Sequence, residues 1–131
     1  MANVQIDEID DLTVTAITHA QLSTISATAT VADARAYFAA STSRRSALVV
    51  DGERYVGGLT PADLPADGDP TLPILPLARP GATVGPDDPA SLGRDLALSA
   101  ESRRIPVVDA DQRLLGVVAV NRTREWFCGT G

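Results

Sequence analysis

The positive charges of this chain all belong to arginine. The sequence has 11 basic residues, and none of them is a lysine. A guanidinium group is planar and can make paired hydrogen bonds to a phosphate or a carboxylate. Four of the arginines form two adjacent pairs, Arg44-Arg45 and Arg103-Arg104. These pairs are candidates for binding an anionic group, and the alternative is a solvated or ion-paired surface role.

Side chains suited to catalysis are few. The one histidine, His19, has no cysteine or second histidine with which to build a metal site. The one cysteine, Cys128, has no histidine nearby in the sequence to activate it as a nucleophile. The sequence also lacks a glycine-rich phosphate-binding loop. We therefore expect a protein that is not an enzyme and requires no metal or cofactor.

The composition is typical of a soluble globular protein, with 44% hydrophobic and 21% charged residues among 131. The net charge of −6 argues against nucleic-acid binding, which needs a positive surface. The sequence contains no run of about 18 apolar residues, which is the length needed to span a membrane. The first residues are acidic, unlike the basic start of a signal peptide. Because a single cysteine cannot form an internal disulfide, we expect a cytoplasmic protein.

An internal repeat organises the chain. Thr24–Leu64 aligns with Thr83–Thr123 without a gap. Both copies contain Ser-Arg-Arg, then an apolar stretch, then a turn, and then a glycine, which is Gly57 in the first copy and Gly116 in the second. A unit of this size buries too little surface to fold alone, so we expect the two copies to pack together.

Each copy predicts a short strand and then a helix. The strands surround Thr24-Ile25 and Thr83-Val84. In the first copy Thr30 can cap the helix, with Asp33 in the first turn. In the second copy Pro89 suits the first helical position. Apolar residues at helical spacing mark the expected buried faces, namely Val31, Ala34, Tyr37 and Phe38 in the first copy and Leu92, Leu96 and Ala97 in the second.

Two strands joined by a tight turn follow in each copy. The first copy predicts strands at Ala47–Val50 and Tyr55–Leu59 around Asp51-Gly52, which is a strong hairpin signal. The second copy predicts strands at Ile105–Val108 and Leu114–Val120. Their apolar residues are nearly continuous, which predicts strands that are buried on both faces.

A second helix is expected to close each unit. Pro65 stops it early in the first copy, and in the second copy it is predicted to run from about Asn121 to Cys128. The stretch between the copies is rich in proline and is expected to be a stiff crossover linker. The predicted organisation is a lead-in segment (1–20), a first repeat (21–65), the linker (66–80) and a second repeat (81–128).

This tandem pattern resembles the CBS-domain family. The resemblance lies in Arg-Arg-Ile-Pro-Val-Val-Asp (103–109), Arg-Leu-Leu-Gly-Val-Val (113–118) and Gly-Leu-Thr-Pro-Ala-Asp-Leu (58–64), and it covers about residues 20–128. It implies an α+β (α/β-like) fold in which tandem β-α-β-β-α repeats pack as a pseudo-twofold pair.

The resemblance also implies a regulatory role. Proteins of this family bind adenosine-containing ligands such as AMP, ADP, ATP or S-adenosylmethionine in clefts between their repeats. They often form dimers and regulate enzymes, channels or transporters. The resemblance therefore implies a ligand-sensing module that binds an adenosine nucleotide, forms a homodimer and regulates a separate protein.

The family's cleft motif, Thr or Ser followed three residues later by Asp, is matched by Thr60 and Asp63. A carboxylate can accept both hydroxyls of a ribose, and a threonine hydroxyl can donate to a phosphate. The structural alternative is that Thr60 caps a helix in which Pro61 and Asp63 occupy the first turn. The second repeat has Ala119 and Arg122 at these positions, so we expect at most one nucleotide site.

The resemblance assigns further ligand contacts to both repeats. They are Thr83, Arg44, Arg103, Arg104, Ile105 and Pro106. Ile105 and Pro106 are equally expected as plain core residues, and the arginines as surface residues. Because one motif is missing, a protein-interaction or dimerisation module that binds no ligand is the alternative function.

Overall fold

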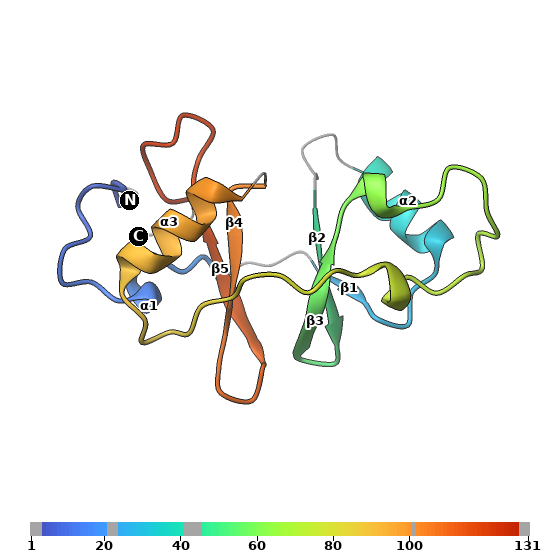
Figure 1. Cartoon of the computed structure of the whole chain (residues 1–131), viewed down its shortest axis with the longest axis horizontal. Helices are drawn as coiled ribbons and strands as arrows, with labels where there is room; N and C mark the ends of the chain where they lie inside the picture. Colours follow the sequence, from blue (N-terminus) through green and yellow to red (C-terminus); the bar gives the residue numbers. More distant parts are fainter. Residues whose placement is uncertain (1–3, 21–23, 41–45, 101, 129–131) are drawn as a thin grey trace. The chain divides into compact units, whose positions relative to one another are not determined.

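The computed structural model describes residues 4–20, 24–40, 46–100 and 102–128. The chain divides into two compact units. Unit 1 consists of Met1–Leu22 together with Ala82–Gly131, and unit 2 is the continuous segment Ser23–Gly81. The colours of Figure 1 follow the chain through both units.

Unit 2 contains a three-stranded sheet with the order β1-β2-β3. Strand β1 (Thr24–Ser26) lies parallel to β2 (Ala47–Asp51), which forms an antiparallel hairpin with β3 (Arg54–Leu59). Parallel neighbours require a crossover, and α2 (Val31–Ala39) provides it on one face of the sheet (Figure 1). The predicted β-α-β-β order of the first repeat is therefore confirmed.

Helix α2 begins where the sequence predicts. The N–H and hydroxyl of Thr30 donate to Asp33 Oδ2 at 3.0 and 3.1 Å, and the Asp33 N–H donates to Thr30 Oγ1 at 3.3 Å. This reciprocal cap satisfies backbone groups that the first turn leaves unpaired. The helix buries Val31 and Ala34. The core of unit 2 is made of Ile25, Ala27, Val31, Ala34, Ala47, Val49, Leu59 and Ile74.

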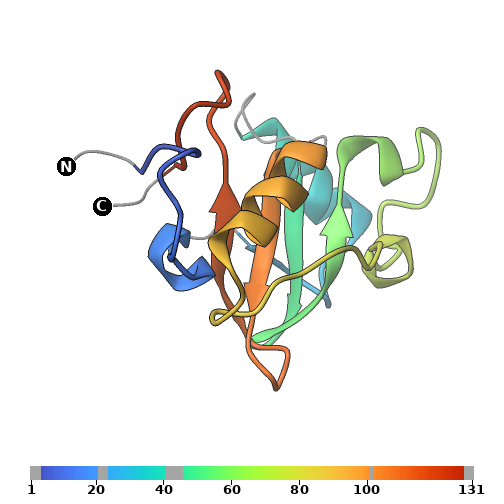
Figure 2. The same cartoon turned by 60° about the vertical axis from the view of Figure 1, so that its left-hand side comes forward.

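The described residues of unit 1 contain the second hairpin and two helices. Strands β4 (Arg104–Val108) and β5 (Leu114–Ala119) are antiparallel. Helix α3 (Ala90–Ser99) packs across this hairpin, and α1 (Val14–Ile17) packs against α3 (Figure 2). The strand expected at Thr83-Val84 is reduced to one parallel bridge between Val84 and Val107.

The buried face of α3 includes Ala97, as the sequence predicts, and Leu96 packs against the core, but Leu92 differs from the prediction. Leu92 is 43% exposed, whereas the helix buries Ala90, Gly93 and Ala97. A Cβ on Gly93 would lie 3.2 Å from Val118 Cγ2, so the helix approaches β5 through its small residues. Close packing therefore selects a stripe of small side chains and turns Leu92 outward. Pro89 stands at the N-cap, one residue before the predicted position.

The helix predicted from Asn121 to Cys128 is wrong, because the segment folds as a loop. The Asn121 Oδ1 atom accepts hydrogen bonds from the N–H groups of Glu125 and Trp126 at 3.0 and 3.2 Å. An asparagine side chain that binds nearby backbone in this way competes with helical hydrogen bonds. Arg124 adopts a left-handed φ of 62°, which a helix does not tolerate.

The lead-in segment pairs with this loop. The Phe127 N–H donates to the Val4 carbonyl at 2.9 Å, and the Ile6 N–H donates to the Glu125 carbonyl at 3.0 Å. Phe127 is fully buried. The core of unit 1 therefore combines residues from both ends of the described chain, which are Ile9, Val14, Ile17, Val84, Ala90, Ala97, Ile105, Val107, Val118, Val120 and Phe127.

The lead-in and the proline-rich linker are two copies of the same structural element. The Leu12 carbonyl accepts the N–H of Ala90, the first residue of α3, at 2.9 Å. The Leu72 carbonyl accepts the N–H of Val31, the first residue of α2, at 2.8 Å. A short helix follows in each case, α1 in the lead-in and η2 (Leu75–Leu77) in the linker. The structural repeat therefore extends beyond the segment that the sequence comparison aligned.

Each copy of this element ends by pairing with a hairpin strand. His19 exchanges two backbone hydrogen bonds with Val117 in β5, at 2.8 and 3.0 Å. Arg79 exchanges two with Gly58 in β3, at 2.9 and 2.8 Å. His19 in unit 1 thus occupies the place that Arg79 occupies in unit 2. In unit 2 this pairing holds Arg79 close to the end of β3.

Candidate functional site

Thr60 and Asp63 lie directly after strand β3. The chain turns there into η1 (Pro61–Asp63), a single 3-10 turn that Pro61 begins. Asp63 Oδ2 accepts the backbone N–H of Thr60 at 2.8 Å and the Thr60 hydroxyl at 2.9 Å. The two residues of the predicted motif are therefore in direct contact. These contacts are those of the structural alternative, in which the pair stabilises a turn.

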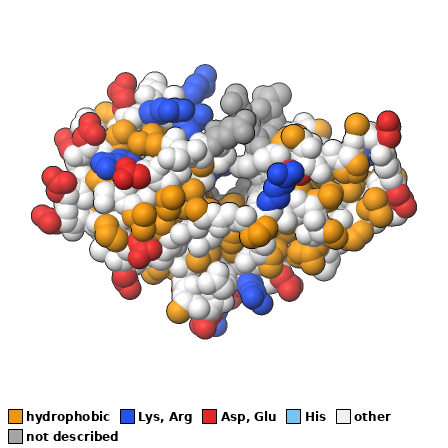
Figure 3. Space-filling view, viewed as in Figure 1, with side chains coloured by type: hydrophobic (Ala, Val, Ile, Leu, Met, Phe, Trp, Pro, Cys, Tyr) orange, Lys and Arg blue, Asp and Glu red, His pale blue; other side chains and the backbone are white. Residues whose placement is uncertain are grey.

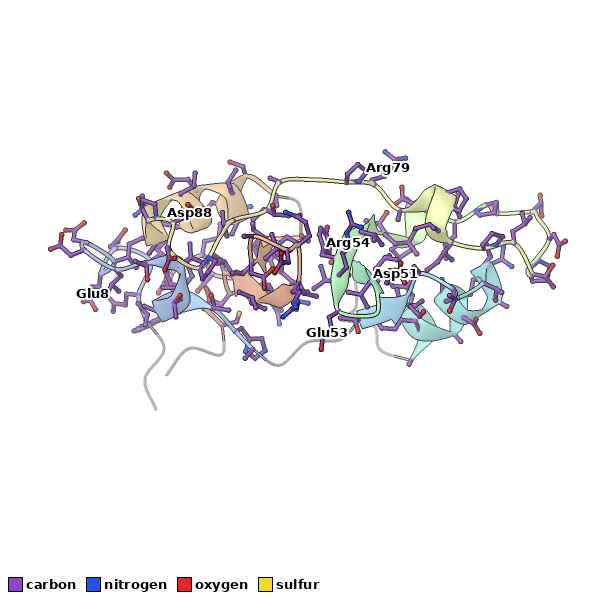
Figure 4. The ribbon with its side chains drawn as sticks, turned by 90° about the horizontal axis from the view of Figure 1, so that it is seen from below. Glu8, Asp51, Glu53, Arg54, Arg79 and Asp88 are labelled. Atoms are coloured by element: carbon purple, nitrogen blue, oxygen red, sulfur yellow. The ribbon has the colours of Figure 1, made fainter. Side chains whose placement is uncertain are left out.

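The second carboxylate oxygen of Asp63 has a partner that the sequence did not predict. Arg79 Nε lies 2.9 Å from Asp63 Oδ1. The side chain of Asp63 is 9% exposed and that of Arg79 is 79% exposed. A nearly buried carboxylate is thus paired with an arginine that extends into solvent, and Figure 4 shows the Arg79 side chain projecting from the linker.

The backbone of Arg79 is held close to β3 by the two hydrogen bonds to Gly58. Gly57 allows this approach, because a Cβ at that position would lie 3.1 Å from Ala78 Cβ and 3.2 Å from the Arg79 carbonyl oxygen. Such distances are tighter than ordinary van der Waals contact. The glycine that the repeat singled out therefore serves to place the linker, and with it Arg79, beside Asp63.

The equivalent positions of unit 1 carry different chemistry. Ala119 ends β5 and is buried, and Arg122 is exposed on the loop that follows. His19 takes the place of Arg79, so the three positions contain no carboxylate. The hydroxyl–carboxylate–guanidinium cluster of unit 2 is therefore not repeated in unit 1.

None of the other predicted ligand contacts that the structure describes belongs to unit 2. Arg44 lies outside the described residues. Thr83, Arg103 and Arg104 belong to unit 1, where Thr83 is half-buried and Arg104 is exposed. Arg103 has a left-handed φ of 56°, and its Nε donates to the Val120 carbonyl at 3.4 Å. Arg103 thus has a structural contact of its own.

Ile105 and Pro106 are buried in β4. Ile105 is part of the core of unit 1, which is the alternative that the sequence left open for it. Both belong to a different unit from Thr60 and Asp63. Their contact with a ligand stays a prediction of the sequence.

The visible surface carries charges of both signs. On the face shown in Figure 3, acidic and basic side chains are interspersed instead of forming a continuous basic area. Among the described residues, no group of three or more histidine, cysteine, aspartate or glutamate side chains could hold a metal ion. No helix in the described ranges is long and apolar enough to cross a membrane.

Comparisons with known proteins identify the fold. No protein-family model matches the chain, and neither does any curated protein. A CBS domain pair/ACT domain protein from Thermotoga maritima matches with a TM-score of 0.71 and 22% identity, over 82% of this chain and 89% of that one. The CBS domains of a transcriptional regulator from Streptococcus pneumoniae match with a TM-score of 0.67 and 27% identity, over 84% and 94%.

A third match is CBSX2, a CBS-pair protein from Arabidopsis thaliana. Its structure in complex with AMP has a TM-score of 0.67 and 23% identity, over 86% of this chain and 91% of that one. The chain therefore has the α+β fold of a CBS-domain pair, as its tandem sequence pattern predicted.

Proposed function

We propose that this chain is a regulatory module that binds an adenosine-containing nucleotide through Thr60 and Asp63. AMP, ADP, ATP and S-adenosylmethionine are the candidate ligands. The observation that carries the proposal is the placement of the Asp63 carboxylate, which is 9% exposed and held by Thr60 at the end of β3. A fixed carboxylate of this kind is an acceptor for the two hydroxyls of a ribose. The fold and the AMP complex of CBSX2 support the choice of ligand class.

The proposal includes the ligand contacts that the sequence assigns to both repeats, and a regulated partner. Thr83, Arg103, Arg104, Ile105 and Pro106 would contribute from unit 1, and Arg44 from unit 2. A homodimer, a separate regulated protein and a cytoplasmic location complete the proposed role. The module itself would perform no chemistry.

A second candidate function is a protein-interaction or dimerisation module that binds no nucleotide. The contacts of Asp63 favour it, because Thr60 and Arg79 already occupy three acceptor positions of the carboxylate. An ionised carboxylate offers about four such positions. The absence of the motif from unit 1 points the same way.

Calorimetric titration with the four candidate ligands separates the two functions. We expect binding by the wild-type protein, and we expect Asp63→Ala to weaken it by about 1–3 kcal/mol, or roughly 10- to 100-fold. Asp33→Ala is a matched control, because the Asp33 carboxylate accepts the same two hydrogen bonds from Thr30 as the Asp63 carboxylate accepts from Thr60. This variant should lose stability and keep its affinity.

The absence of heat with every ligand at millimolar concentration would reject the nucleotide proposal and favour the interaction module. Equal losses of affinity in Asp33→Ala and Asp63→Ala would show that the motif acts only through the stability of unit 2.

A further inference from the structure

The pairing of Asp63 with Arg79 restricts what the carboxylate can bind. Oδ2 accepts two hydrogen bonds from Thr60, and Oδ1 accepts one from Arg79 Nε. Since a carboxylate has about four acceptor positions, one position is left. Two ribose hydroxyls need two positions. A ribose can therefore bind Asp63 through both hydroxyls only if one of the present donors moves away.

Two of the three donors belong to side chains that can turn away, the Thr60 hydroxyl and the Arg79 guanidinium, and Arg79 is the one that extends into solvent. Its side chain is 79% exposed, so water competes for the guanidinium and weakens the ion pair. The Thr60 N–H, in contrast, is fixed by the backbone of the turn, in which the Asp63 N–H donates to the Thr60 carbonyl at 3.0 Å. A ligand would thus displace the arginine side chain and leave the turn intact.

The displaced guanidinium would stay next to the site. Its backbone remains attached to Gly58 by two hydrogen bonds, and Gly57 keeps the linker in close contact with β3. Only the side chain is therefore free to turn. A guanidinium held within one side-chain length of a ribose-binding carboxylate is well placed to bind an anionic group of the same ligand, since arginine makes paired hydrogen bonds to phosphate.

We propose that Arg79 exchanges its contact with Asp63 for a contact with the ligand's phosphate, and that it thereby selects phosphate-bearing nucleosides over neutral ones. This inference rests on the proposed nucleotide function and narrows its ligand class. In the free protein Arg79 occupies an acceptor position of the Asp63 carboxylate. When a nucleotide binds, Arg79 contacts the ligand instead.

The test compares AMP with adenosine, which differ only in the phosphate. Calorimetry is performed on the wild-type protein and on Arg79→Ala, Arg79→Gln and Asp63→Ala. Arg54→Ala is the matched control, because Arg54 is an exposed arginine of the same unit, four residues along β3 from Gly58. Figure 4 shows Arg54 at the hairpin with Asp51 and Glu53.

We expect Arg79→Ala and Arg79→Gln to weaken AMP binding roughly 10- to 100-fold, as for the loss of a charge-assisted contact. Adenosine binding should stay equal or become up to about 5-fold tighter, because the competing donor has gone. Arg54→Ala should change neither affinity, and Asp63→Ala should weaken both. Melting temperatures of the Arg79 variants close to that of the wild type show that the fold is retained.

Three results would overturn the inference. If AMP binds with the wild-type affinity to both Arg79 variants while Asp63→Ala weakens it, Arg79 is no phosphate contact and the proposed function still stands. If AMP and adenosine tighten by the same factor, Arg79 only blocks the carboxylate. If the wild-type protein binds neither AMP nor adenosine, the inference fails together with the proposed function.

Discussion

Among the described glycines, Gly116 has the least room for an added methyl group. Gly116 lies in β5 beside the segment in which His19 pairs with Val117. A Cβ at this position would overlap Thr18 Cγ2 and lie 2.7 Å from the His19 carbonyl oxygen. The carbonyl belongs to the backbone and cannot rotate away, so Gly116→Ala must push the lead-in segment off the strand.

The size of the effect follows from the contacts that would be lost. The segment is attached there by two backbone hydrogen bonds, at 2.8 and 3.0 Å between His19 and Val117. Each contributes about 1 kcal/mol net, and overpacking in general costs about 1–3 kcal/mol. We expect Gly116→Ala to lower the free energy of unfolding by about 2–3 kcal/mol. The melting temperature should fall by roughly 6–15 °C for a chain of this size.

Thermal unfolding followed by circular dichroism measures this change. Gly81→Ala is the control, because a Cβ at Gly81 meets nothing within 4 Å. Where the backbone permits it, this substitution raises stability by about 0.4–1 kcal/mol through the unfolded state. If Gly116→Ala melts within about 2 °C of the wild type, which corresponds to less than about 1 kcal/mol, the close approach of the lead-in to β5 is refuted.

Three further outcomes are expected. Hydrogen bonds from the Thr71 hydroxyl and N–H lower the pKa of Asp69. The ionised Asp69 carboxylate therefore stabilises the folded protein above the ordinary pKa of about 3.9, and this stabilisation is lost as the pH falls through the lowered value. Thr71→Ala should raise that pKa in an NMR titration. Burial raises the pKa of Tyr55, so stability should fall as the pH rises above about 10, and Tyr55→Phe should remove this part of the loss. Asn121→Ala should lower the free energy of unfolding by about 1–3 kcal/mol, because two backbone N–H groups lose their acceptor. Chemical denaturation measures this change, and an unchanged unfolding midpoint would contradict it.

The elements that local chemistry determines could be predicted from the sequence. Asp51-Gly52 predicted a hairpin, and Gly52 has the positive φ of 65° that such a turn requires. Thr30 and Asp33 predicted the start of α2 through a cap that needs only neighbouring residues. Both signals act over a few residues, so tertiary packing has little opportunity to override them.

The contacts made by distant segments could not be predicted in the same way. The lead-in and the linker share little sequence, and their alignment is one residue out of step with the rest of the repeat. Arg79 is a single arginine among prolines, and only the pairing with Gly58 brings it to Asp63. The sequence predicted a helix after β5, but the Asn121 side chain binds backbone N–H groups that a helix would use.

The discontinuity of unit 1 has a consequence for the order in which a growing polypeptide can mature. Chains are synthesised from the N-terminus, and compact regions fold as they emerge. Unit 2 is continuous and is complete once Gly81 has been made. The lead-in is translated before unit 2, yet the surfaces that bury its Val14 and Ile17 are translated after unit 2. Until the second part of unit 1 has been made, these two side chains have no permanent partners, so the lead-in reaches its final place only after the complete unit 2 has left the ribosome.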